Sequence, residues 1–448
     1  MNGSIGVRVT ILAGAATGLL AGAAGRAQDA AAAAAPAAVN SGDTAWVLLG
    51  VALVLLMTIP GLAFFYGGLV RRKNVLSILM QCFMLMCLIS LQWVCFGYSL
   101  SFGPDIRGLI GSLDWSFLHG VGQDPHAGYA ATIPHLAFMA FQMMFAVITP
   151  ALILGAFAER MKFVAFCAFM LIWATVVYDP LAHWVWGLGG FLRLDGALDF
   201  AGGTVVHINA GIAALVCALV LGKRVGYPAR MSPPHNLPFA VLGAGLLWFG
   251  WFGFNAGSAL AANGLAASAL VATHVAAAAA GLTWAGMDWL FNRHATVLGM
   301  ITGAVAGLVA ITPAAGFVTP MGAIAIGIGA GVLPYFFVSV IKPKLGYDDT
   351  LDAFGVHGVG GIWGALATGL FATKAVNSGG ADGLFYGNPA QFVIQLKAVL
   401  VTIVYSGVLT FVILKVVSLV TSLRPSEQSE RIGLDLTDHR ETGYTVMD

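Results

Sequence analysis

Long apolar stretches alternate with short polar segments along almost the whole chain. Because the hydrocarbon core of a bilayer is about 30 Å thick, a helix that crosses it needs about 20 apolar residues. We therefore expect about eleven membrane-spanning helices, one for each long apolar stretch. The stretches lie near residues 46–70, 75–101, 132–157, 163–186, 204–222, 237–260, 264–290, 297–316, 319–341, 351–373 and 393–422. This pattern predicts an all-α polytopic membrane protein with a membrane domain over residues 44–422.

The first apolar stretch of the chain is shorter than the others and follows a basic residue. Arg8 precedes about twelve apolar residues, and small residues follow up to Ala27, which is the order typical of a secretory signal peptide. We predict a signal peptide over residues 1–27 and a flexible leader over residues 28–43. A short extra spanning helix is the alternative, but about twelve residues fall short of the ~20 that a bilayer requires.

Composition supports a membrane protein and excludes several other classes. Hydrophobic residues make up 59% of the chain and charged residues 9%, so most of the outer surface must face lipid. Lys and Arg (21) balance Asp and Glu (20), which excludes a nucleic-acid binder that relies on neutralising phosphates. The five cysteines lie in apolar runs without Cys-x-x-Cys or Cys/His spacing, so neither a disulfide framework nor a zinc site is indicated.

Basic residues predict the orientation, because Lys and Arg collect in the short cytoplasmic loops of membrane proteins. The loops on one side hold Arg71, Arg72, Lys73, Arg160, Lys162, Lys223, Arg224, Arg230, Arg293, Lys342 and Lys344. The loops on the other side hold only Arg107, Arg193 and Lys374. We therefore expect the mature N-terminus outside the cell. An odd number of spans then makes residues 423–448 a cytoplasmic tail.

Small residues recur four positions apart in several spans, as in Gly299, Gly303 and Gly307. Such rows let helix backbones approach closely in lipid. The abundant glycine therefore predicts close helix packing and requires no cofactor-binding loop.

Ionisable groups inside a membrane are costly and are functional candidates for that reason. In this chain the deep candidates are His207, His274 and His357. His207 and His357 lie five spans apart, and each follows an acid at the head of its helix, Asp199 or Asp352. Two successive units of five spans have opposite orientations in the membrane. The similar placement of the two histidines therefore predicts an inverted repeat with both histidines near the midplane. For His274 we expect a structural role.

Four motifs resemble the ammonium transporters, the Amt/Mep/Rh family, and in particular its bacterial Amt branch. They are MTIPGLAFFYGG at 57–68, GALDFAGGTVVHINA at 196–210, GWFGFNAGS at 250–258 and DAFGVHG at 352–358. The similarity runs from about residue 44 to the tail. It implies a homotrimer with one pore in each subunit. It also implies eleven spans, arranged as an inverted five-plus-five repeat that the last helix closes.

The resemblance implies an outer site made of aromatic residues. Phe145, Trp186 and Ser258 would form the ammonium recruitment site, and the rings of Phe145 and Phe254 would block the pore below it. An aromatic face attracts a partly desolvated cation by up to about 2 kcal/mol, and a serine hydroxyl can accept an N–H bond. Without the resemblance, a less favoured alternative interprets Phe145 and Trp186 as aromatic anchors at headgroup depth.

Below that site the resemblance implies twin pore histidines, His207 and His357, with Asp199 supporting the outer site. Potassium has a similar size to ammonium but cannot lose a proton, so a path for the neutral amine rejects it. Hydrogen-bonded imidazoles can pass ammonia along or relay its proton. From its position alone, Asp199 is a helix-terminal acceptor for backbone N–H groups. Asp179, an acid where the better-known bacterial members are apolar, would attract cations if it lies at the outer mouth.

Residues 430–444 resemble the family's tail, which implies a cytoplasmic PII signal protein as a partner. We expect ammonium transport across the bacterial plasma membrane, with NH4+/NH3, lipid and other copies of the chain as further partners. No enzymatic activity, resident metal or cofactor is implied. A membrane ammonium sensor that signals through the tail is the alternative. A zinc hydrolase is a weaker hypothesis, because no carboxylate or thiolate adjoins the histidines. Passage of another neutral gas and the net transported species stay open.

Overall fold

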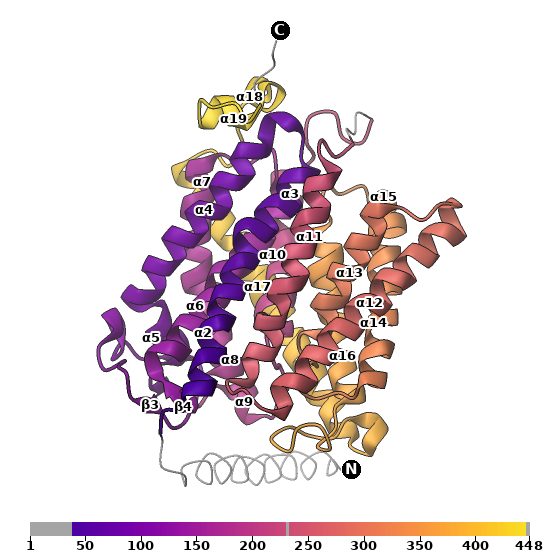
Figure 1. Cartoon of the computed structure of the whole chain (residues 1–448). Coiled ribbons are helices and arrows are strands. Elements are labelled where there is room, and N and C mark those ends of the chain that lie inside the picture. The colour runs from indigo at the N-terminus through magenta and orange to yellow at the C-terminus, as the bar shows by residue number, and fades with distance from the viewer. Residues whose placement is uncertain (1–37, 230–232, 445–448) are drawn as a thin grey trace, which may run out of the picture.

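The computed structural model describes residues 38–229 and 233–444. The predicted signal peptide, most of the predicted leader, Arg230 and the last residues of the tail lie outside the described residues. The described chain is a bundle of helices that run between two ends of the molecule (Figure 1). One end carries two small sheets, and the other carries the helices of the tail.

The helices of the first part of the chain are α2 (Ser41–Leu56), α3 (Ala63–Leu69), α4 (Val75–Gln92), α5 (Tyr98–Phe102), α6 (His135–Phe157), α7 (Phe163–Trp173), α8 (Asp179–Trp186), α9 (Phe191–Leu194) and α10 (Asn209–Leu221). Those of the second part are α11 (Leu237–Trp251), α12 (Gly264–Asn292), α13 (Val297–Ile311), α14 (Pro320–Phe336), α15 (Lys342–Leu345), α16 (Gly360–Phe371), α17 (Pro389–Val420), α18 (Glu427–Ile432) and α19 (Leu434–Asp438). The π-helical stretches that interrupt them include η7 (Gly203–Ile208), η8 (Phe252–Ala256) and η11 (Phe354–Val359). A short 3-10 turn, η9 (Gly257–Ala259), follows η8.

Ten helical segments of the described chain are long and apolar enough to cross a membrane, and each coincides with a predicted span. They are Ser41–Leu69, Arg72–Phe102, His135–Phe157, Phe163–Leu194, Gly203–Leu221, Leu237–Ala259, Gly264–Asn292, Pro320–Leu345, Phe354–Phe371 and Pro389–Val420. The prediction of an all-α polytopic membrane protein is confirmed.

The predicted span over residues 297–316 is shorter in the structure. It corresponds to α13, which ends at Ile311 after 15 residues. Pro313 has no N–H with which to continue the helical hydrogen bonds, and its carbonyl instead accepts the Phe200 N–H at 3.1 Å. The chain therefore leaves the helix inside the bundle and turns before α14.

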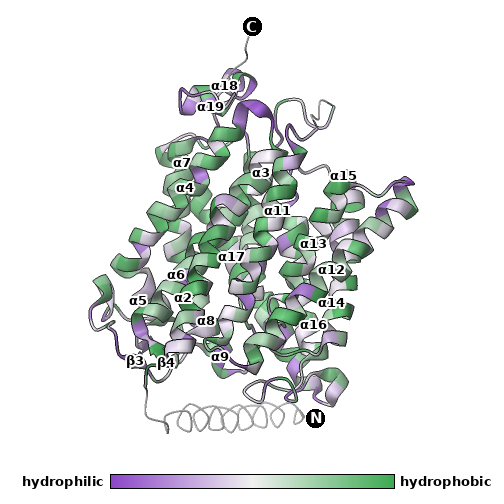
Figure 2. Cartoon of the chain, viewed as in Figure 1, coloured by the Kyte–Doolittle hydropathy of each residue, from purple (hydrophilic) through white to green (hydrophobic). Residues whose placement is uncertain are grey.

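Two small antiparallel sheets lie between α5 and α6. Strand β1 (Asp105–Ile106) pairs with β2 (Ile110–Gly111), and β3 (Pro125–His126) pairs with β4 (Ala130–Pro134). Figure 2 shows hydrophobic residues along the helices and more hydrophilic residues toward the two ends of the bundle. This is the distribution expected of a body whose middle faces hydrocarbon.

Close helix packing at the predicted glycine row is confirmed between α12 and α13. A Cβ atom added at Gly307 would lie 2.6 Å from the carbonyl oxygen of Ala276. A Cβ atom at Gly303 would meet the carbonyl oxygen of Ala280 at 3.0 Å. The two backbones approach so closely because glycine has no side chain at these positions.

Charged groups at the tail end of the bundle form a network, which we call the inner-end network, of Arg71, Glu159, Arg224 and Asp348. Glu159 lies 2.6 Å from Arg71 and 3.4 Å from Arg224, and Arg224 lies 2.8 Å from Asp348. Burial alone would raise the pKa of the Glu159 carboxyl, but hydrogen bonds and the two guanidinium charges lower it below its ordinary value. The network joins loops from both halves of the membrane domain.

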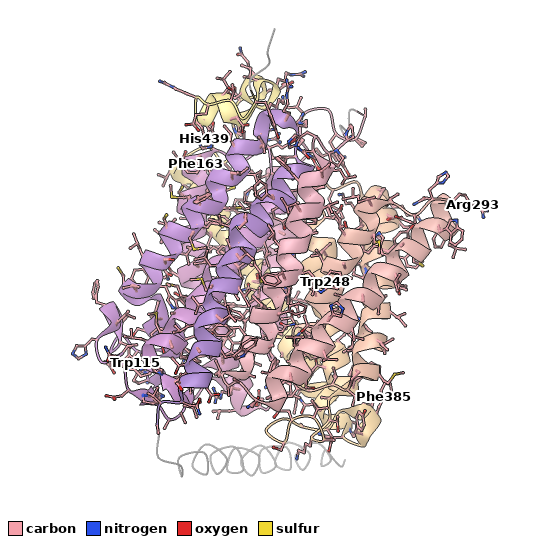
Figure 3. The ribbon with its side chains drawn as sticks, in the orientation of Figure 1. Trp115, Phe163, Trp248, Arg293, Phe385 and His439 are labelled. Atoms are coloured by element: carbon pink, nitrogen blue, oxygen red, sulfur yellow. The ribbon has the colours of Figure 1, made fainter. Side chains whose placement is uncertain are left out.

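The tail lies against this same end of the bundle. The Asp435 carboxylate accepts the Ser77 N–H at 2.8 Å, at the start of α4. Asp438 accepts the Phe163 N–H at 3.1 Å, and the ring of His439 packs edge-on against Phe163 (Figure 3). The tail therefore contacts the first turns of two spans.

Candidate functional site

Three cavities follow one another through the interior, and we name them outer, middle and inner from the sheet end to the tail end. Their volumes are about 270, 10 and 250 Å³. The middle and inner cavities share Phe65, Val305 and His357. Phe145 lines the outer cavity and Phe254 the middle one, so these two rings separate the two spaces.

The structure brings the three predicted recruitment residues to the outer cavity. Phe145 comes from α6, Trp186 from the end of α8 and Ser258 from η9. The rings of Phe145 and Trp186 meet edge to face with centroids 5.8 Å apart. The Ser258 hydroxyl donates to the Phe254 carbonyl oxygen at 2.8 Å, so the oxygen of Ser258 keeps its lone pairs for a donor in the cavity.

Phe145 and Phe254 close the floor of the outer cavity. Their rings are stacked, with centroids 4.3 Å apart and an interplanar angle of 28°. The two side chains are 1% and 0% exposed. A ligand in the outer cavity reaches the middle cavity only if these rings move.

The two predicted pore histidines meet between the middle and inner cavities. The Nδ1 atoms of His207 in η7 and His357 in η11 lie 3.4 Å apart, and the ring planes make an angle of 18°. A hydrogen bond between two Nδ1 atoms requires opposite tautomers, because one atom must donate and the other must accept. The other ring nitrogen of His207 has no partner among the described residues and is therefore available to a ligand.

Glycines one helical turn beyond each histidine permit this approach. A Cβ atom at Gly211 would collide with the backbone of Gly358, and one at Gly361 would lie 3.0 Å from the Ile208 nitrogen. Each histidine motif thus carries a glycine at position i+4 that lets the other helix pass. The spacing is the same in both halves, which agrees with the predicted repeat.

Asp199 holds the start of the helix that carries His207. Its carboxylate accepts the N–H groups of Gly202 at 2.7 Å, Gly203 at 2.6 Å and Thr204 at 2.8 Å. Gly202 has a φ of 114°, which turns these N–H groups toward one acceptor. The Asp199 carbonyl accepts the indole N–H of Trp186 at 2.9 Å. One residue therefore supports both the helix end and the wall of the outer cavity.

The counterpart of Asp199 in the second half is Asp349, and the expectation of Asp352 was wrong. Asp349 accepts the N–H groups of Ala353 at 3.0 Å and Phe354 at 2.8 Å. Asp352 instead forms an ion pair with Lys342 at 2.6 Å. Asp349 stands eight residues before its histidine, as Asp199 does, so this equal spacing was the signal that the sequence offered.

Two other acid and histidine candidates lie away from the cavities. Asp179 is fully buried and accepts a hydrogen bond from Gln92 at 2.7 Å. It lines none of the three cavities, so a role in attracting cations at the mouth is not supported. His274 is exposed on α12, where the centroid of its ring lies 5.3 Å from that of Trp248, and it lines none of the three cavities.

Trp251 is a site residue that the sequence interpretation missed. Its ring stacks on His207 with centroids 5.5 Å apart, and its N–H donates to the Thr312 hydroxyl at 2.9 Å. Thr312 therefore both follows the end of α13 and anchors the tryptophan. The available signal was spacing, because Trp251 precedes Phe254 by three residues and so lies on the same helical face.

The fold and the three cavities define a polytopic helical membrane protein with an interrupted internal path. The chain belongs to the Ammonium Transporter Family, whose model matches residues 45–444. An ammonium transporter of Bacillus subtilis (strain 168) is 55% identical over 403 residues, which cover 90% of this chain and 98% of that protein.

Solved structures agree with this membership. The crystal structure of Saccharomyces cerevisiae Mep2 has a TM-score of 0.81 and 36% identity, and covers 87% of this chain and 88% of Mep2. A structure titled sensor Amt protein has a TM-score of 0.82 and 31% identity over 89% of this chain and 98% of its own. Membership supports ammonium transport and places the chain among transport proteins, which are not enzymes.

Proposed function

We propose that this protein carries ammonium across a bacterial plasma membrane by capturing NH4+ in the outer cavity and passing ammonia along the two histidines. The observation that carries the proposal is the series of three cavities, closed by stacked rings, with paired imidazoles at their deepest point. Recruitment, closure and relay are thus assigned to successive positions along one path.

Capture relies on Phe145, Trp186 and Ser258. The aromatic faces attract a cation that has lost part of its water, and the free lone pairs of Ser258 accept one N–H bond. Potassium gains the first interaction but cannot make the second, because it has no hydrogen to donate. Ammonium is therefore favoured in the outer cavity.

Charge is excluded beyond the stacked rings. The middle cavity of about 10 Å³ has room for about one water molecule, so a cation there would lose most of its hydration. Ammonia avoids that cost because it is neutral. Loss of a proton before or at Phe254 therefore makes passage possible and separates ammonium from alkali cations.

The opposite tautomers of His207 and His357 provide one donor and one acceptor along the path. Ammonia can donate to one ring nitrogen and accept from another, and the same pair can relay a proton. Trp251 fixes the plane of the His207 ring by stacking on it, since its own N–H is held by Thr312.

The assembly, orientation and partner are also part of the proposal. We assign a homotrimer, with the mature N-terminus outside and the tail in the cytoplasm, where a PII protein would bind it. An imidazole exposed on the outer face of α12 fits contact with a neighbouring subunit better than contact with lipid. Clustering of the inner-end network with the tail agrees with the predicted orientation.

Currents from proteoliposomes test the proposal. An ammonium jump should give a saturable, protein-dependent current or internal pH change, and a potassium jump should give neither. The double variant His207→Ala/His357→Ala should lose conduction or selectivity, whereas His294→Ala, an exposed histidine outside the three cavities, should match the wild type. A current would mean coupled movement of proton and amine, and a pH change alone would mean passage of ammonia. Wild-type behaviour of the double variant would contradict the proposal.

The sensor alternative is not favoured, because relatives such as the Bacillus subtilis protein are named transporters. Removal of residues 423–448 distinguishes the two hypotheses. Both hypotheses let transport continue without the tail, so the readout is ammonium-dependent regulation: its loss with transport intact would favour a sensor, and unchanged regulation would favour a transporter.

A further inference from the structure

Among the described residues that line the outer cavity, one is charged, and the sign of its charge is unexpected for a site that collects a cation. Arg193, on α9, lines the cavity together with Ser258 and Gln142, and the rest of the described lining is aromatic, aliphatic or glycine. No carboxylate belongs to that lining. The cavity wall is therefore positively charged.

The charge of Arg193 is not neutralised by an ion pair within the described residues. Its Nη1 atom donates to the Trp186 carbonyl oxygen at 2.5 Å, and no carboxylate of residues 38–229 or 233–444 lies within ion-pair distance of it. Two acids of the same end have other partners: Asp195 pairs with Lys397 at 2.5 Å, and Asp105 pairs with His183 at 2.9 Å. The Asp199 carboxylate is occupied by backbone N–H groups.

A nearby positive charge disfavours a bound cation but leaves a neutral molecule almost unaffected. In the outer cavity it therefore raises the free energy of NH4+ relative to NH3. Deprotonation breaks one N–H bond, leaves the electron pair on nitrogen and transfers the proton to water in the mouth of the cavity. The same charge thus weakens capture and favours the step that follows capture.

We propose that Arg193 tunes ammonium turnover by electrostatic destabilisation of NH4+ in the outer cavity, which drives its deprotonation. This role rests on the proposed function. Through its bond to the Trp186 carbonyl, Arg193 also positions one wall of the site. The two roles make opposite predictions for affinity: loss of a repulsive charge tightens binding, whereas displacement of Trp186 weakens it.

The test is a concentration series of ammonium transport in proteoliposomes with Arg193→Gln, Arg193→Glu and Arg193→Lys. In Arg193→Gln we expect the half-saturation concentration and the maximal rate both to fall by about threefold to tenfold, as for one unit charge a few ångström away in a solvent-filled cavity with a dielectric constant close to that of water. Arg193→Glu should lower the half-saturation concentration and the maximal rate further, and Arg193→Lys should retain wild-type kinetics. Arg107→Gln removes the same charge from an exposed loop outside the cavity and should change neither quantity.

Ionic strength provides a second measurement. Added impermeant salt screens the guanidinium, so the half-saturation concentration of the wild type should fall toward that of Arg193→Gln, while the variant should respond little. A half-saturation concentration that rises in both Gln and Glu variants would show positioning of Trp186 alone and overturn the proposal. Unchanged kinetics in both would also overturn it. Absence of transport by the wild type would instead contradict the proposed function.

Discussion

At the scale of single residues, the crossing of the two histidine helices depends on Gly211. A methyl group there would collide with the Gly358 backbone and push η11 away from α10. We expect Gly211→Ala to lower the free energy of unfolding by about 1–3 kcal/mol, because overpacking strains the crossing, and to stop transport. Gly245→Ala is the control, since a Cβ atom there meets nothing within 4 Å. Thermal unfolding and proteoliposome flux measure both effects. A Gly211→Ala variant that behaves like Gly245→Ala would show that the helix crossing can accommodate a methyl group.

The two acids before His357 differ in what their carboxylates hold. Asp349 is 0% exposed and caps the helix of His357, so Asp349→Asn should destabilise the protein by about 1–3 kcal/mol. Asp352→Asn leaves the helix end capped by Asp349 and keeps a side-chain oxygen for the Lys342 ammonium, so it should cost less than Asp349→Asn. Thermal unfolding shows which of the two variants is the less stable. The reverse order would restore Asp352 as the counterpart of Asp199.

This pair also shows where sequence interpretation ends at the residue scale. The motifs placed His207 and His357 in spans of opposite orientation, and the structure brings them together. The motif beginning at Asp352 drew attention to the wrong acid, because a carboxylate at a helix head and one that pairs with Lys342 look alike in sequence. The spacing of eight residues from the histidine, which Asp349 shares with Asp199 and Asp352 does not, separates the two acids. Trp251 was missed because its role depends on contact with His207 from another helix, which its spacing from Phe254 does not show.

At the scale of elements, the tail is expected to stay docked because it caps the N-terminus of a membrane-spanning helix, α4. The N-terminus of α4 has no side-chain cap of its own, and Asp435 supplies the acceptor for Ser77. Asp435→Ala should therefore release α19, with a local cost of about 1 kcal/mol. Limited proteolysis of the tail should become faster. Glu427→Ala on α18, which removes an exposed pair with Arg431, should leave the cleavage rate unchanged. Equal cleavage rates of the tail in both variants would exclude the contact of Asp435 with the start of α4 as the one that docks the tail.

The inner-end network gives the stability a defined dependence on pH. The pKa of Glu159 is lowered in the folded protein, as is that of Asp348, whose burial is outweighed by hydrogen bonds and charge from Arg224. Both contribute stability that is complete above the unfolded values of about 4 and is lost as the pH falls through the lower folded values. The melting temperature should therefore fall once the pH is below about 4. At pH 6 the melting temperature of Glu159→Gln should be lower than that of the wild type. On acidification the melting temperature of the variant should fall less. Parallel curves would contradict this linkage.

Spans are the elements that sequence predicts best, because about 20 apolar residues have few alternatives in a bilayer. Their internal breaks are not predictable in this way. The π-helical turns at Gly203–Ile208, Phe252–Ala256 and Phe354–Val359 contain glycine, but so do the regular helices α13 and α14, so composition does not mark the turns that hold His207, Phe254 and His357. The early end of α13 was marked by Pro313, but the hydrogen bond from the Phe200 N–H to the Pro313 carbonyl joins segments far apart in sequence and is not predictable from the local pattern.

At the scale of the whole molecule, the path is occluded as it stands. Cavities of about 270 and 250 Å³ are joined only through one of about 10 Å³, which holds about one water molecule. We therefore expect proteoliposomes containing the wild type to show the water permeability of lipid alone, measured by light scattering after an osmotic jump. Phe254→Ala removes the ring between the outer and middle cavities, so water permeability should rise and potassium should begin to pass. Phe252→Ala removes a neighbouring ring that lines none of the three cavities and should change neither. A water-tight, selective Phe254→Ala protein would place the barrier at the histidines, because their narrow cavity would then suffice to exclude hydrated ions.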